Sequence, residues 1–263
     1  MLEVVTTATL AEAAAAMGPG ARFLGGGTLV MRAANEGDPT LRRIVRSTER
    51  LDRIQTEGNR IRIGAGVTMS GLLAARETAF LAPAARAVGG PQVRNQATVG
   101  GNLHAPHPYG DLTVALLALD GIVHLSNGQD MALEPYLAAR AHPPGLVAAV
   151  SVTQPMGEAF RFRKVSRIKP KGVSVLSMAA HLSRSAGRLS GVRIAYGAMG
   201  PAPVRAAAVE RALEGADLSA TGIASALAQA TVGLEPPDDA LASAWYRREV
   251  APVHLRRLLL GEP

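Results

Sequence analysis

Two glycine-rich segments, at residues 23–29 and 97–103, constrain this chain more than any other feature. The first reads FLGGGTL and the second reads ATVGGNL, so each places a threonine beside its glycines. Because glycine has no Cβ, the backbone amides of such segments can approach an anion closely. One segment alone is weak evidence, but the pair predicts a diphosphate held from two sides. A dinucleotide cofactor is therefore the leading interpretation.

The residues around the first glycine segment are typical of a small α/β unit. A strand, a glycine turn and a helix, in that order, point helix N-terminal amides at a phosphate. The expected elements are helix 7–17 with Thr7 or Thr9 as its cap, strand 22–24, helix 28–34 and strand 43–46.

A second unit is expected around the other glycine segment. Residues 60–66 alternate between polar and apolar side chains, which predicts a half-buried strand. Asp111 precedes an apolar stretch and is a suitable N-cap for a helix. The remaining elements expected in this unit are helices 70–76, 82–87 and 112–119 and strands 121–125 and 146–152.

Residues 154–157, which include a proline and a glycine, mark a boundary before the last part of the chain. Beyond it, strands come first and helices second, which is the α+β pattern. The expected strands are 160–164, 173–182 and 191–197, and the expected helices are 206–213, 223–231 and 240–260.

Composition excludes several classes of protein. The 263 residues include no cysteine, which excludes disulfides, thiolate metal sites and an Fe–S cluster carried by this chain. No apolar run is long enough to span a membrane, and the N-terminus lacks the pattern of a secretory signal. The formal net charge is +7, but the basic residues are scattered along the chain, and only four Phe and four Tyr are available for base stacking. We therefore expect no nucleic-acid partner.

Five segments, in the same order, resemble one known family over essentially the whole chain. They are the GGGT loop at 25–28, the run QVRNQATVGGNL at 92–103 with Pro108 and Asp111 after it, FRKVSR at 162–167, the stretch 197–215, and YRR at 246–248. The sequence resembles the FAD-binding (medium) subunits of molybdenum hydroxylases, the group that contains carbon monoxide dehydrogenase and xanthine dehydrogenase. One departure is Gly172, where the family often has an aspartate.

The resemblance implies an α+β fold with a two-subdomain, PCMH-type FAD-binding domain followed by an α+β C-terminal domain. The expected C-terminal domain has a three-stranded antiparallel sheet plus three helices. The implied boundaries are 1–55 for a small α/β FAD-binding subdomain, 56–157 for a second FAD-binding subdomain and 158–263 for the C-terminal domain.

The resemblance also implies a function. The chain would be an oxidoreductase subunit that carries FAD and passes electrons from the [2Fe-2S] clusters of a small partner subunit to an external acceptor. The molybdenum cofactor would sit on a large partner subunit, in a cytoplasmic dimer of heterotrimers. The alternatives are a stand-alone FAD-dependent oxidase or dehydrogenase, a flavin-free interaction subunit and a basic nucleic-acid-binding module. The substrate of the complex and its electron acceptor stay open.

Residues are assigned to the cofactor by their position in the family motifs. The first loop and the second loop would hold the diphosphate, Asp111 would accept from ribityl or ribose hydroxyls, and Lys164 would approach the flavin. Asp111 is equally well explained as a helix cap, and Leu146 and Val147 as core residues. The expected cofactor-binding residues are Leu24, Gly25, Gly26, Gly27, Thr28, Leu29, Thr98, Gly100, Gly101, Asn102, His107, Asp111, Leu146, Val147 and Lys164.

We expect no catalytic residue and no metal ligand on this chain. His104 and His107 have the spacing of a metal-binding pair, but no third ligand of suitable spacing is evident. No Ser-His-Asp set or pair of carboxylates indicates hydrolysis. The roles of His104 and Tyr109 stay open.

Overall fold

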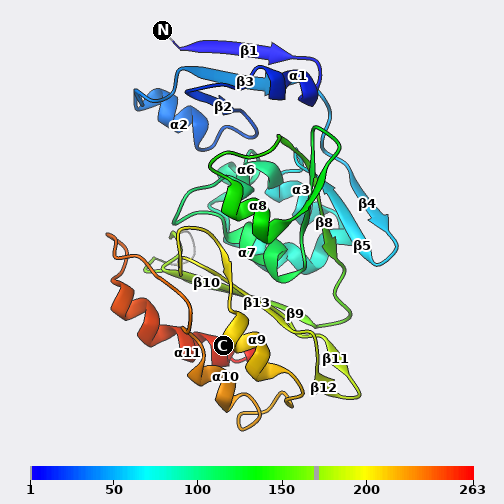
Figure 1. Ribbon diagram of the computed structural model, residues 1–263, viewed down its shortest axis with the longest axis vertical. Helices are drawn as coiled ribbons and strands as arrows, with labels where there is room; N and C mark the ends of the chain where they lie inside the picture. Colours follow the sequence, from blue (N-terminus) through cyan, green and yellow to red (C-terminus); the bar gives the residue numbers. More distant parts are fainter. Residues whose placement is uncertain (1, 169–171) are drawn as a thin grey trace.

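The computed structural model describes residues 2–168 and 172–263, in which three larger β-sheets follow one another along the chain. Figure 1 shows the N-terminal sheet at the top, a largely helical middle unit below it, and the C-terminal sheet with its helices at the bottom. Within the described residues, no helix has the length and apolarity needed to cross a membrane.

The N-terminal unit is a parallel three-stranded sheet in the order β1-β3-β2 with two short helices. Its elements are β1 (Glu3–Thr7), α1 (Leu10–Ala15), β2 (Ala21–Phe23), α2 (Val30–Asn35) and β3 (Arg43–Ser47). The first helix starts later than predicted because Thr9 caps it: the Thr9 hydroxyl accepts from the Glu12 amide, and the Glu12 carboxylate accepts from the Thr9 amide. Thr7 lies in β1, an edge strand that the sequence reasoning did not predict.

The middle unit is an antiparallel five-stranded sheet in the order β4-β5-β8-β6-β7, covered by helices. Its strands are β4 (Ile54–Glu57), β5 (Arg60–Gly64), β6 (Ile122–Leu125), β7 (Asp130–Ala132) and β8 (Val147–Thr153). Its helices are α3 (Met69–Ala74), the 3-10 helix η1 (Arg76–Leu81), α4 (Ala82–Ala87), α5 (Pro91–Arg94), α6 (Val99–Leu103), α7 (Asp111–Ala118) and α8 (Leu133–Ala139). Because β4 pairs with β5, the sheet topology favours a subdomain boundary before Ile54 over one at 55/56.

The C-terminal unit is α+β, as predicted. Its antiparallel sheet has the order β14-β13-β10-β9, so a short fourth strand joins the three that were expected. The strands are β9 (Phe160–Val165), β10 (Leu176–His181), β11 (Arg184–Ser185), β12 (Arg188–Leu189), β13 (Arg193–Gly197) and β14 (Val204–Arg205), of which β11 and β12 form a separate hairpin. The helices are α9 (Ala207–Leu213), α10 (Ala224–Ala228) and α11 (Ala244–Leu260).

Helix α7 joins the middle and C-terminal units. All of its residues are buried, and it packs against α4 and α6 on one side and against β10 and β13 of the C-terminal sheet on the other. A helix that is apolar all round is stable only where it is enclosed by other elements. Ala179 of β10 and Ala195 of β13 belong to the same apolar cluster as α7, so the C-terminal sheet shares the core of the middle unit.

We expect the substitution Leu116→Ala to lower the free energy of unfolding by about 2–5 kcal/mol, because it leaves a cavity in this shared core. Leu116 is fully buried in α7. Chemical denaturation of the purified chain measures the change. Met156→Ala is the control, since Met156 is 88% exposed. Equal stability of the two variants would contradict the central position of α7.

Candidate functional site

The structure brings the two glycine segments into direct contact. A Cβ placed on Gly25 would lie 2.8 Å from Thr98 Oγ1, and one placed on Gly26 would overlap the carbonyl oxygen of Gln96. Only glycine allows two backbones to approach this closely. The absence of side chains in the first loop is therefore needed for the loops to meet, before any ligand is considered.

The first loop has a run of backbone amides without an internal acceptor. The Leu24 amide donates to the Val45 carbonyl at 2.7 Å, but the amides from Gly25 to Leu29 have no hydrogen-bond acceptor in the part of the chain that the structure describes. Helix α2 begins at Val30, later than predicted, so Thr28 and Leu29 belong to the loop. Backbone donors need a partner, and a run of free ones next to glycines suits an anion such as phosphate.

The second loop differs from the first, because its backbone amides already donate hydrogen bonds within the protein. Thr98 is the N-cap of α6, and its hydroxyl oxygen accepts from the Gly101 amide at 3.1 Å. The Gly100 amide donates to the Ala65 carbonyl at 2.9 Å, and a Cβ on Gly100 would come within 2.9 Å of the Ala65 Cβ. The glycines of this loop therefore serve close packing, and the amides that suit an anion belong mainly to the first loop.

Asn102 keeps one end of its side chain available. Its Oδ1 accepts from the Thr113 amide at 3.0 Å and from the Thr113 hydroxyl at 3.1 Å. These bonds fix the orientation of the amide group, since Oδ1 must face Thr113. Its Nδ2 has no acceptor among the described residues, so it remains a donor at the second loop.

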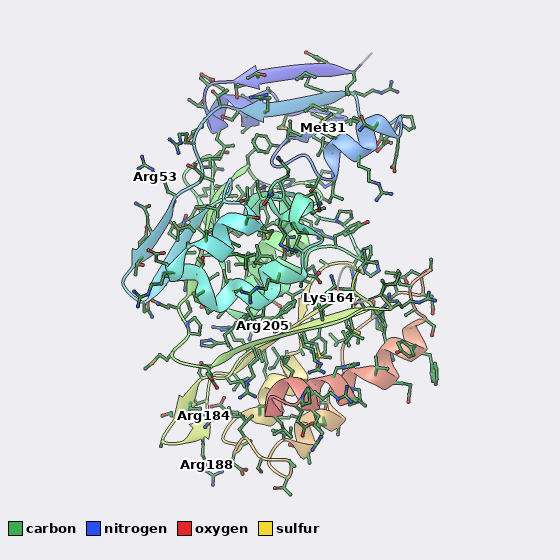
Figure 2. All side chains as sticks on the ribbon, turned by 180° about the vertical axis from the view of Figure 1, so that it is seen from behind. Met31, Arg53, Lys164, Arg184, Arg188 and Arg205 are labelled. Atoms are coloured by element: carbon green, nitrogen blue, oxygen red, sulfur yellow. The ribbon has the colours of Figure 1, made fainter. Side chains whose placement is uncertain are left out.

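Asp111 is not the cap of α7, which corrects one of the two sequence interpretations. The N-cap is Gly110, at φ 101°, without a side-chain hydrogen bond. The two Asp111 carboxylate oxygens instead accept from Lys164 Nζ at 2.8 Å and from Ser174 Oγ at 2.5 Å. Lys164 Nζ also donates to the Ala87 carbonyl at 2.8 Å. Figure 2 shows Lys164 at the junction of the middle unit and the C-terminal sheet.

The ion pair of Asp111 and Lys164 is buried, with 8% and 13% of the two side chains exposed. The Lys164 ammonium is therefore compensated by a carboxylate and does not stand alone. The pair links α7 to β9 and so joins the two units.

Local sterics explain why position 172 is a glycine. A Cβ at this position would overlap the carbonyl oxygen of Ile168, and the Gly172 amide donates to that same oxygen at 2.8 Å. Position 172 therefore has no room for the aspartate side chain that is frequent in the resembled family. Two residues later, Ser174 makes the contact with Asp111.

Leu146 and Val147 lie in the core, which is the alternative that the sequence left open. Leu146 is 7% exposed and packs in the cluster of the N-terminal unit, with Leu10 and Val45. Val147, at 5% exposed, belongs to the cluster of the middle unit. The two side chains thus join the hydrophobic cores of adjacent units.

Hydrogen bonds hold the first residues of the loop between Asn102 and Asp111. His104 Nε2 lies 2.9 Å from the Tyr136 hydroxyl, and Arg140 Nη1 donates to the Ala105 carbonyl at 3.4 Å. Burial lowers the pKa of His104, and the nearby Arg140 guanidinium lowers it further. His104 is therefore a neutral structural residue here.

The rest of this loop reaches two other units. His107 Nε2 lies 2.6 Å from the Asp239 carboxylate, and the Tyr109 hydroxyl lies 3.5 Å from Arg32 Nη1. Sequence reasoning missed Asp239 and Arg32, since no local pattern links residues so far apart in the chain. Within residues 2–168 and 172–263, no group of His, Asp or Glu side chains could hold a metal ion.

The structure brings a serine, a histidine and an aspartate together, which the sequence did not reveal. The Ser151 hydroxyl lies 2.6 Å from His124 Nε2, and His124 Nδ1 lies 2.6 Å from Asp130 Oδ1. The three residues stand on neighbouring strands of the middle sheet, so only the fold reveals them. Ser151 is 3% exposed and closed to a substrate, so no hydrolytic role follows.

Comparisons with known proteins cover both parts of the chain. Residues 1–155 match the family described as the FAD binding domain in molybdopterin dehydrogenase. Residues 161–261 match the CO dehydrogenase flavoprotein C-terminal domain.

Individual relatives are also dehydrogenase subunits of this kind. A putative xanthine dehydrogenase FAD-binding subunit of Escherichia coli is 28% identical over 232 residues, which are 81% of this chain and 79% of that protein. The glyceraldehyde dehydrogenase medium chain of Sulfolobus acidocaldarius is 28% identical over 65% of this chain, and the match spans 63% of that medium chain.

The fold is shared with a solved CO dehydrogenase from Oligotropha carboxidovorans. The TM-score is 0.88 at 23% identity, and the match covers 98% of this chain and 96% of the other. Since the first family match spans more than half of the residues, the chain belongs to the family of FAD-binding domains of molybdopterin dehydrogenases, and its cofactor is FAD.

Proposed function

We propose that this chain is the FAD-carrying electron-transfer subunit of a molybdenum hydroxylase complex. It would receive electrons from the [2Fe-2S] clusters of a partner subunit and pass them to an external acceptor. The observation that carries the proposal is the run of free amides from Gly25 to Leu29, held against the second glycine loop. Bound FAD would supply the redox chemistry, and the protein would supply binding and electrostatic tuning.

The residues present fit the diphosphate of this cofactor. The amides and the Thr28 hydroxyl would donate to phosphate oxygens, as charge-assisted hydrogen bonds. From the second loop, the Thr98 hydroxyl and Asn102 Nδ2 would donate to the diphosphate from the other side. Gly100 and Gly101 would let the backbone of this loop lie close to the ligand. Because the first loop is fixed by its contact with Gln96, these donors need little reorganisation when the ligand arrives.

The other expected site residues take narrower roles in the proposal. Asp111 would orient Lys164 as a buried ion pair, so that Lys164 does not act as a free cation. His107 would approach the cofactor from the loop that follows Asn102. Leu146 and Val147 support it from the core.

The proposal includes the partners that the family resemblance implies. They are a molybdenum-cofactor large subunit and a [2Fe-2S] small subunit, arranged as a dimer of heterotrimers in the cytoplasm. Relatives are named as the medium chain of carbon monoxide dehydrogenase and the medium subunit of nicotine 6-hydroxylase. The predicted division into residues 1–55, 56–157 and 158–263 belongs to the same proposal, with its first boundary moved to before Ile54 because β4 pairs with β5.

A visible absorption spectrum of the purified chain, followed by heat release and chromatography, tests the proposal. Flavin bands and released FAD are the expected result. A colourless chain that takes up no added FAD would favour the flavin-free interaction subunit. Substrate oxidation by the isolated chain would favour the stand-alone oxidase or dehydrogenase.

We expect Gly26→Ala to weaken FAD binding by about a hundredfold, the equivalent of losing one or two charge-assisted hydrogen bonds. The new methyl group would overlap the Gln96 carbonyl and push the first loop away from the second. Equilibrium titration with FAD measures the effect. Gly18→Ala is the matched control, since a Cβ at Gly18 meets nothing within 4 Å. Equal affinities for the two variants would rule out the two-loop site.

We expect Lys164→Met to lower the free energy of unfolding by about 3–5 kcal/mol, because it leaves the Asp111 carboxylate buried without its cation. Denaturant titration of the chain without FAD measures this loss. The double variant Asp111→Asn with Lys164→Met should recover part of it, since it removes the unpaired charge. If the single variant is as stable as the natural chain, the pair does not hold the units together.

A further inference from the structure

A fully buried arginine organises the segment that precedes α11. Arg247 is 0% exposed, and its Nε donates to the Val175 carbonyl at 2.9 Å. Its Nη1 donates to the carbonyl oxygens of Pro237 and Ala242, and its Nη2 donates to the Asp239 carboxylate at 2.8 and 3.0 Å. The guanidinium is therefore used on all three of its nitrogens, as a buried charge requires.

Asp239 connects this arrangement to the rest of the molecule. Its Oδ1 also accepts from the amides of Leu241 and Ala242, at 2.8 and 3.0 Å. Its Oδ2 lies 2.6 Å from His107 Nε2. Partial burial raises the pKa of Asp239, but the hydrogen bonds from His107, Arg247 and the two amides outweigh burial and lower it. Asp239 is thus a charged acceptor, which strengthens each of these bonds.

The loop that carries His107 touches all three units of the fold. It contacts the middle unit through His104 and Tyr136, the C-terminal unit through His107 and Asp239, and α2 of the N-terminal unit through Tyr109. Helix α2 directly follows the first glycine loop. The loop therefore extends from the second glycine segment, at Asn102, to the unit that contains the first.

We propose that Asp239 and Arg247 are positioning residues that act through His107. Together they hold in place the 104–110 loop, which directly follows the second glycine loop, so that breaking the link speeds the release of FAD. The C-terminal unit would thereby control cofactor retention, although the free amides belong to the N-terminal unit. This inference rests on the proposed function, since it assumes that FAD binds at the two glycine loops.

The contact between His107 and Asp239 suits such a role. In the part of the chain that the structure describes, this loop makes one side-chain hydrogen bond to the C-terminal unit, from His107 to Asp239, and 23% of each side chain is exposed. A half-buried, charge-assisted bond is stronger than an exposed ion pair. Among the described contacts, Arg247 reaches the loop through Asp239, so both residues would act at a distance from the cofactor.

The test measures the dissociation constant and release rate of FAD for the full chain, followed by the fluorescence of the released flavin. His107→Ala and Asp239→Asn should each weaken binding about tenfold, which is about 1.4 kcal/mol. The double variant should be no weaker than either single variant, because both break the same link. Affinities equal to that of the natural chain, or effects that add, would overturn the inference.

Two further variants separate a hydrogen bond from a loss of folding. His107→Gln keeps a side-chain nitrogen donor and should restore FAD retention relative to His107→Ala. Release as fast as that of His107→Ala would overturn the role of the hydrogen bond. His142→Ala, at an exposed histidine, is the control and should release FAD like the natural chain. If the natural chain itself binds no FAD, the proposed function fails together with this inference, whereas unchanged variants reject this inference alone.

Discussion

The backbone contact between Gly26 and Gln96 is the constraint on which the candidate site depends. The two residues belong to different units, so their contact fixes the N-terminal sheet relative to the helices of the middle unit. Among the described residues, the amides of the first loop from Gly25 to Leu29 have no internal acceptor. A site built in this way is pre-organised, because the loops already meet before a ligand binds.

The C-terminal unit is held to the same structure by two different kinds of interaction. Helix α7 supplies apolar packing against β10 and β13, and the buried pair of Asp111 and Lys164 supplies a specific polar link. A second polar link joins His107 to Asp239. Apolar packing contributes most of the free energy, whereas the polar links set the orientation of the units, since a misplaced buried charge is costly.

Much of the fold could be predicted from the sequence, because the informative patterns are local. The helix at 82–87 matches α4, and the two glycine segments indicated the cofactor class. Pairings between distant residues could not be predicted: nothing near Asp111 identifies Lys164 and Ser174 as its partners. The hydrogen bonds of the second loop's amides in α6, and the contact of Ser151 with His124, also depend on packing. They could not be predicted from the sequence.

A crystal structure of the chain with FAD bound tests the central claim most directly. The account predicts phosphate oxygens of the diphosphate within hydrogen-bond distance of the amides between Gly25 and Leu29, with Asn102 Nδ2 on the opposite side. The second loop should contribute the Thr98 hydroxyl and few backbone amides. A diphosphate bound away from the first loop, with those amides still unpaired, would contradict the account.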